Sequence, residues 1–156
     1  MSSYFSKLQD KAGETIQAIC DELRSEETFG TGGLVVGMGM SGTLPLVPVH
    51  LAAGLAFRAI RKGDDSSHGS ADPESPRVGT EARYVIIDDL VDTGATVRTI
   101  IDKLPKHWEC AGVLLYQSNE TSRMNVPEFI PHLNVCHLPF RNLGREVHTA
   151  KEVSVE

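Results

Sequence analysis

The segment from Asp88 to Thr96 holds the residues best suited to bind a small molecule. Two adjacent carboxylates, Asp88 and Asp89, follow an unbroken apolar run, and the turn Thr93-Gly94-Ala95-Thr96 comes shortly after them. Carboxylates accept hydrogen bonds from vicinal hydroxyl groups, whereas backbone N–H groups, threonine hydroxyls and a helix N-terminus suit a phosphate. The combination predicts a site for a ribose 5-phosphate. The alternative is a helix N-cap cluster with solvated aspartates.

A second candidate phosphate loop is Gly37-Met38-Gly39-Met40-Ser41-Gly42, which matches the pattern G-x-G-x-x-G. Glycines between a strand and a helix let backbone N–H groups approach a phosphate. A dinucleotide site would also need an acidic residue at the end of the second strand, where this chain has Arg61-Lys62. A P-loop is excluded because no Lys-Ser or Lys-Thr closes the motif. The remaining alternative is a tight turn that binds no ligand.

These loops need a scaffold of alternating strands and helices. Apolar residues at three-to-four spacing predict helices over 5–23 and 96–104. Apolar runs predict strands at 34–36, 57–60, 84–87, 113–116 and 135–138. In the apolar segment 44–55, Pro45 suits a first helical turn, whereas Pro48 would kink or delay the helix. The alternation predicts an α/β domain with a mainly parallel sheet flanked by helices, in which ligands bind at the carboxyl ends of strands.

Composition narrows the classes of function. The 156 residues fit a single domain over 1–156, and no apolar run approaches the roughly 20 residues of a membrane-spanning helix. The start of the chain lacks the pattern of a signal peptide. A net charge of −6 argues against a broad nucleic-acid-binding face. Three widely spaced cysteines are typical of buried thiols in a reducing compartment. We therefore expect a cytoplasmic domain that binds neither nucleic acid nor membrane.

Residues 63–81 differ from the rest of the chain in composition. Ala71 and Val78 are their only apolar residues, among four Ser, two Pro and three Gly. Structureless loops longer than about 12–15 residues are uncommon in compact domains, where they are usually lids or disordered linkers. We expect a flexible loop, either a lid or a disordered linker; the alternative is a tolerated surface insertion.

Residues 84–100 resemble the phosphoribosyl pyrophosphate (PRPP) motif of type I phosphoribosyltransferases. The resemblance implies that Asp88 and Asp89 bind the ribose hydroxyls and Mg²⁺, and that Thr93-Gly94-Ala95-Thr96 binds the 5-phosphate. It also implies that Asp92 is the general acid/base beside a purine ring. The wording of the motif is similar above all to bacterial xanthine-guanine and hypoxanthine-guanine enzymes. The fold implied is that of the family, with a long mobile loop and a small hood.

Other segments match this family in their order along the chain. Gly39-Met40-Ser41-Gly42 lies where the family has its pyrophosphate loop, and Arg61-Lys62 resembles a basic pair of adenine-type enzymes. Phe140-Arg141-Asn142-Leu143 is similar to a Phe-Arg-Asp-Leu segment of hypoxanthine-guanine enzymes, which implies that Arg141 contacts pyrophosphate. The resemblance further implies Mg²⁺ as cofactor and a homodimer or larger homo-oligomer.

The chain departs from the family's pattern at several positions. Met40-Ser41 stands where the pyrophosphate loop often carries a charged residue, and Asn142 replaces an aspartate. Gln117 stands where 6-oxopurine enzymes carry a lysine; its amide can donate to a carbonyl or accept from an exocyclic amine. Tyr116 and His137 are further candidates for contacting the base, because aromatic faces suit flat rings.

The sequence thus predicts transfer of the phosphoribosyl group from PRPP to a nucleobase, with release of pyrophosphate. Asp92 and the motif's wording favour a 6-oxopurine (guanine, hypoxanthine or xanthine) and a role in purine salvage. One alternative is an enzyme for adenine or another nucleobase, and a second is a non-catalytic regulator that binds PRPP. A dinucleotide-binding domain would leave the segment from Asp88 to Thr96 unexplained.

Overall fold

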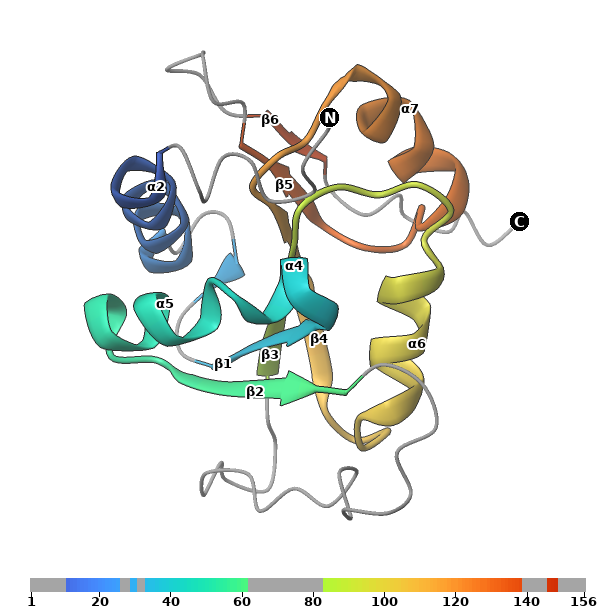
Figure 1. The fold of residues 1–156 in the computed structure, drawn as a ribbon. Helices are drawn as coiled ribbons and strands as arrows, with labels where there is room; N and C mark the ends of the chain where they lie inside the picture. The colour runs from blue at the N-terminus through green and yellow to red at the C-terminus, as the bar shows by residue number, and fades with distance from the viewer. Residues whose placement is uncertain (1–10, 26–28, 31–32, 62–82, 139–145, 149–156) are drawn as a thin grey trace.

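The computed structural model describes residues 11–25, 29–30, 33–61, 83–138 and 146–148. The elements of this part follow in the order α2 (Ala12–Arg24), β1 (Leu34–Met38), α4 (Gly39–Thr43), α5 (Leu46–Ala53), β2 (Ala56–Ile60), β3 (Arg83–Asp88), α6 (Ala95–Lys103), β4 (Glu109–Leu115), α7 (Glu120–Phe129), β5 (Val135–His137) and β6 (Glu146–His148). The strands form one sheet in the order β2-β1-β3-β4-β5-β6 (Figure 1). All neighbours are parallel except β5 and β6, which confirms the predicted mainly parallel α/β architecture.

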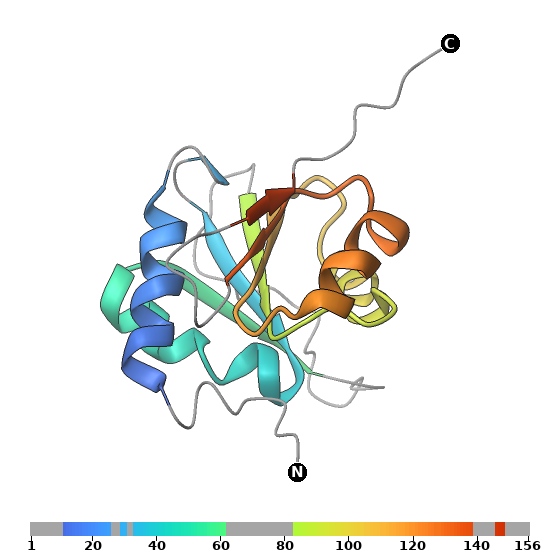
Figure 2. The same ribbon diagram turned by 90° about the horizontal axis from the view of Figure 1, so that it is seen from above.

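Helices cover both faces of the sheet, because alternate strand residues point to opposite sides. Val35 and Leu114 belong to a core cluster with buried residues of α2 and α5. Val36 and Val113, their chain neighbours, belong to a second cluster with buried residues of α6 and α7. Figure 2 shows the two pairs of helices on opposite sides of the sheet. A sheet buried on both faces explains why its strands read as unbroken apolar runs.

The segment after β1 forms two helices instead of a turn and one delayed helix. The short α4 starts directly after the strand, and α5 follows with Pro45 as its N-cap. Pro48 is the third residue of α5, and the first helical hydrogen bond joins the Val49 N–H to the Pro45 carbonyl at 3.0 Å. Because the first-turn N–H groups of a helix have no intrahelical acceptor, Pro48 costs α5 no hydrogen bond.

Two further elements were not predicted from the sequence. The helix α7 contains Pro127 and has only Ser122 and Val126 buried, so it lacks a strong apolar stripe. The strand β6 is three residues long and antiparallel, at the edge of the sheet. The predicted start of the first helix near residue 5 and the predicted loop over 63–81 lie outside the described residues. Among the described residues, no helix is long and apolar enough to cross a membrane.

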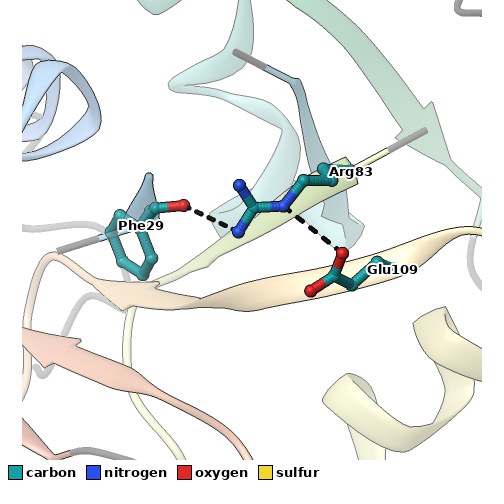
Figure 3. Close-up of polar contacts among 3 residues, drawn as sticks. All are labelled: Phe29, Arg83 and Glu109. Carbon is teal, nitrogen blue, oxygen red and sulfur yellow. Dashed lines mark hydrogen bonds and ion pairs between the residues drawn. The ribbon is translucent and has the colours of Figure 1, made fainter. Parts of the chain in front are cut away.

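The amino end of the sheet is held by Arg83, the first residue of β3 (Figure 3). Its Nη2 donates to the Phe29 carbonyl at 3.0 Å, and its Nε lies 3.5 Å from Glu109 Oε2. The Phe29 ring packs against Gly112, where a Cβ would approach a ring carbon to 2.6 Å. These contacts connect the start of β3 to β4 and to the segment before β1, at the end of β3 opposite to Asp88.

Candidate functional site

The carboxyl ends of β1 and β3 meet at one edge of the sheet, because the strands are parallel neighbours with Val36 opposite Ile86. A cavity of about 590 Å³ opens there, within the range of small-molecule sites. Residues 38–41 and 88–97 line it. The structure thus brings the two loops that the sequence singled out, more than 40 residues apart in the chain, into one site.

The glycine pattern allows α4 to fold back tightly on the sheet. A Cβ on Gly37 would lie 2.0 Å from the Gly42 carbonyl oxygen, so these two glycines pack directly against each other. Gly39 has a φ of 70°, a conformation that favours glycine. Gly39, Met40 and Ser41 line the cavity, whereas Gly42 is buried behind them. The three glycines of the motif therefore allow the close packing and the backbone conformation of this loop, and the loop faces the cavity.

Asp88 and Asp89 lie at the carboxyl end of β3, where both line the cavity, and each residue is only 5% exposed. Asp88 Oδ1 accepts hydrogen bonds from Ser41 Oγ at 3.1 Å and from the Asp89 N–H at 2.9 Å. Asp89 Oδ1 accepts from the Leu90 N–H at 2.8 Å. Burial, together with the neighbouring Asp89 carboxyl, raises the pKa of Asp88 to about 7. Burial also raises the pKa of Asp89. Strongly perturbed carboxyl groups in a cleft are typical of functional sites.

The second loop turns at Gly94, which has a φ of 76° and is the N-cap of α6. The Ala95 N–H lies 3.3 Å from Thr93 Oγ1, a long contact that a stronger acceptor can replace. Asp92 and Thr93 are exposed, and Thr96 is half-buried in the first turn of α6. Two hydroxyls and the first-turn N–H groups of α6, which have no intrahelical acceptor, therefore face an anion site at the rim of the cavity.

The base of this loop is held by α7. The Val91 N–H donates to Ser122 Oγ at 2.9 Å, and Asn125 Nδ2 lies 3.4 Å from the Val91 carbonyl oxygen. Ser122 is itself fixed because its N–H donates to the side chain of Asn119, the N-cap of α7. Sequence reasoning missed Ser122 and Asn125, although Asn119 is a favoured N-cap residue that could have marked the helix.

The remaining predicted site residues fall into three groups. Arg61 is exposed directly after β2, at the same sheet edge, because Ile60 pairs with Met38. Gln117 is half-buried, and its N–H donates to the Asp89 carbonyl at 2.8 Å. Tyr116 and His137 are fully buried in the core, a placement that does not support stacking of either ring on a base. Lys62 and Arg141 lie outside the described residues.

The acidic pair fits a magnesium ion of the kind completed by substrate oxygens. Mg²⁺ is usually bound by one or two carboxylates together with phosphates and water. Asp89 Oδ2 is buried and has no hydrogen-bond partner in the described structure, so a carboxylate oxygen is available as a ligand. The described residues contain no group of three or more His, Cys, Asp or Glu that could hold a metal by themselves.

Comparison with known proteins identifies the fold. No protein-family profile and no curated protein matches the chain. The chain is similar to the orotate phosphoribosyltransferase of Aeropyrum pernix, with a TM-score of 0.57 and 15% identity over 88% of this chain and 76% of that one. It is similar to the adenine phosphoribosyltransferase of Saccharomyces cerevisiae, with a TM-score of 0.55 and 18% identity over 74% of this chain and 75% of that one. A third similar structure, the adenine phosphoribosyltransferase of Thermoanaerobacter pseudethanolicus, has a TM-score of 0.51 and 16% identity, with 74% of each chain covered. The chain therefore has the fold of type I phosphoribosyltransferases.

Proposed function

We propose that this chain is a phosphoribosyltransferase that moves the phosphoribosyl group of PRPP to a nucleobase. The observation that carries the proposal is the shared cavity, in which a buried carboxylate pair lies between two loops that each begin a helix. The first-turn N–H groups of a helix have no intrahelical acceptor and suit phosphate oxygens. A ribose with a phosphate at one end and a pyrophosphate at the other matches this order of donors and acceptors. The fold supports the same function, because the similar structures named above are phosphoribosyltransferases.

In the proposed reaction, the protein's main task is to position its substrates. Asp88 and Asp89 accept hydrogen bonds from the ribose hydroxyls, while Thr93-Gly94-Ala95-Thr96 binds the 5-phosphate. Gly39-Met40-Ser41-Gly42 receives the pyrophosphate, with Arg61, Lys62 and Arg141 as further cationic partners. The C–O bond to pyrophosphate breaks and pyrophosphate leaves with the electron pair. A ring nitrogen of the base forms the new C–N bond, and its proton passes to Asp92.

Magnesium, when bound by Asp88 and Asp89, would neutralise part of the charge on pyrophosphate. The two carboxylates hold that position because main-chain N–H groups and Ser41 fix two of their oxygens. We further propose that the protein acts in the cytoplasm as a homo-oligomer. The loop over 63–81 is proposed to close over the bound substrates and exclude water.

We propose a 6-oxopurine as the acceptor base. Asp92 supports this choice because it is exposed at the cavity and can exchange a proton with the five-membered ring of a purine. The likeness of the segment 87–94 to xanthine-guanine enzymes supports it as well. Gln117 lies beside Asp89 and can hydrogen-bond either an oxo or an amino group. One mismatched polar group between the base and the site costs about 1–3 kcal/mol of binding free energy, which is enough to change the preference between two bases about tenfold.

Pyrophosphate release from PRPP and Mg²⁺ tests the proposal directly. The acceptors are adenine, guanine, hypoxanthine, xanthine, uracil and orotate, each at the same concentration. We expect the highest rate with guanine, hypoxanthine or xanthine. A preference for adenine or a pyrimidine would contradict the 6-oxopurine assignment while leaving phosphoribosyl transfer intact.

A second candidate function is a PRPP-binding regulator without catalytic activity. Met40 favours it, because an apolar side chain that is 63% exposed stands in the loop proposed for pyrophosphate. The replacement of an aspartate by Asn142 favours it too. In this case PRPP would bind to the protein, and none of the bases would release pyrophosphate.

A further inference from the structure

Tyr116 contacts both loops of the site from within the core. Its ring is fully buried on the side of the sheet that faces α2 and α5. Its phenol Oη donates to the Ser41 carbonyl in α4 at 2.5 Å, and its N–H donates to the Asp88 carbonyl at 3.0 Å. One residue directly after β4 therefore binds the proposed pyrophosphate loop and the main chain at Asp88 at the same time.

A hydrogen bond from Ser41 to Asp88 completes a closed network of three residues. Ser41 Oγ donates to Asp88 Oδ1 at 3.1 Å, so Tyr116, Ser41 and Asp88 are joined pairwise by three hydrogen bonds. The bonds join residues far apart in the sequence, since Tyr116 and Ser41 are 75 positions apart. Such a closed network restricts the distance between α4 and the end of β3 more than any single bond does.

We propose that Tyr116 is a positioning residue that holds the pyrophosphate loop at a fixed place relative to Asp88 and Asp89. The inference rests on the proposed function and deepens it, because a ligand such as PRPP must reach both loops at once. A phenol suits this task, since it donates one hydrogen bond without adding charge beside two carboxylates. Burial raises the pKa of Tyr116, so the hydroxyl keeps its proton and remains a donor.

The proposal predicts a selective effect of removing one oxygen atom. In Tyr116→Phe the ring still fills the core, but the Ser41 carbonyl loses its donor and α4 can move relative to the carboxylates. PRPP needs both loops, whereas ribose 5-phosphate needs only the carboxylates and the turn after Asp92. The Kd of PRPP should therefore rise about tenfold, and that of ribose 5-phosphate should stay within about twofold.

The experiment is calorimetric titration of the full chain with Mg²⁺, using PRPP and ribose 5-phosphate as separate ligands. Tyr84→Phe is the matched control, because Tyr84 is also a buried tyrosine of the sheet but lies at the opposite end of β3. We expect the control to bind both ligands as the wild type does. Tyr116→Met also removes the donor to the Ser41 carbonyl while it keeps an apolar side chain in the core, and it should show the same selective loss.

Each outcome has a distinct meaning. Wild-type affinities in Tyr116→Phe would overturn the inference and leave the proposed function standing, as would equal weakening of both ligands. If Tyr116→Phe did not fold, Tyr116→Met, which also lacks the phenol oxygen, would decide in its place: a selective loss of PRPP affinity would support the inference, and any other result would overturn it. A wild-type protein that binds neither ligand would overturn the proposed function, and the inference with it.

Discussion

Asp88 and Asp89 place two carboxyl groups side by side where water hardly reaches them. Each is 5% exposed, and Asp89 Oδ2 has no hydrogen-bond partner in the described structure. Burial of adjacent acidic groups is unfavourable unless a cation or a hydrogen-bond donor compensates it. Removing one carboxylate should therefore stabilise the ligand-free protein while it weakens ligand binding. This opposition is a common trade-off between stability and function.

Asp88 should make stability depend on pH in a specific direction. Its folded-state pKa of about 7 lies above the value near 3.9 of an unfolded aspartate, so the folded state holds the proton more tightly. The resulting stabilisation is complete below about pH 4 and is lost as the pH rises through 7. Between pH 5 and pH 8 the wild type should lose about 2 kcal/mol more free energy of unfolding than Asp88→Asn. Urea unfolding of the metal-free protein measures the free energy of unfolding at each pH. If the wild type and Asp88→Asn had the same pH dependence, the raised pKa of Asp88 would be contradicted.

Asp92 should affect the chemical step more than binding. Asp92→Asn keeps the shape of the side chain but removes the carboxylate proposed to accept the proton from the base. The kcat for the best base should fall by roughly 100-fold or more, since proton transfer by a positioned group contributes about that much. The Kd of PRPP should change by less than about threefold. Steady-state kinetics and calorimetry on the same preparations separate the two effects, and an unchanged kcat would remove Asp92 from the proton transfer.

At the scale of elements, α7 supports the loop that carries Asp92 and the phosphate turn. Ser122→Ala should leave the buried Val91 N–H without its acceptor, at a cost of about 1–3 kcal/mol. The loop would relax, and the Kd of ribose 5-phosphate should rise about tenfold. Ser122→Thr keeps a hydroxyl and should restore binding. Calorimetry with ribose 5-phosphate checks both variants.

Met124 provides the control for this prediction on the same helix. It is 70% exposed, so Met124→Ala should leave both the stability and the Kd of ribose 5-phosphate unchanged. If Ser122→Ala bound ribose 5-phosphate as tightly as Met124→Ala does, α7 would have no part in forming the phosphate turn.

The strands and loops of the site could be predicted from the sequence, whereas the residues that support them could not. The apolar runs of β1 and β3 and the residue types of the two loops are local signals. The contact between Tyr116 and Ser41 depends on how two distant segments pack, so the sequence suggested only that Tyr116 could contact a base. Pro127 and the polar residues of α7 hid the helix that contributes Ser122.

At the scale of the whole molecule, the contacts of Arg83 and the cavity lie at opposite ends of the sheet. Arg83 connects Phe29 and Glu109 at the amino end of β3, whereas Asp88 ends the same strand at the cavity. Arg83→Met should therefore lower the free energy of unfolding by about 1–2 kcal/mol without changing the Kd of PRPP. Urea unfolding and calorimetry measure the two quantities, and a weakened PRPP affinity would show that the two ends are coupled.

The most direct measurement is calorimetric titration of PRPP with Mg²⁺ into the wild type and into Asp88→Asn/Asp89→Asn, both checked for folding by circular dichroism. Arg83→Met serves as a control that is destabilised at the far end of the sheet. The wild type and the control should bind PRPP with the same Kd. The double variant should bind at least about 100-fold more weakly, because two hydrogen bonds to charged acceptors are lost. An unchanged PRPP affinity in the folded double variant would contradict a ribose site at Asp88 and Asp89.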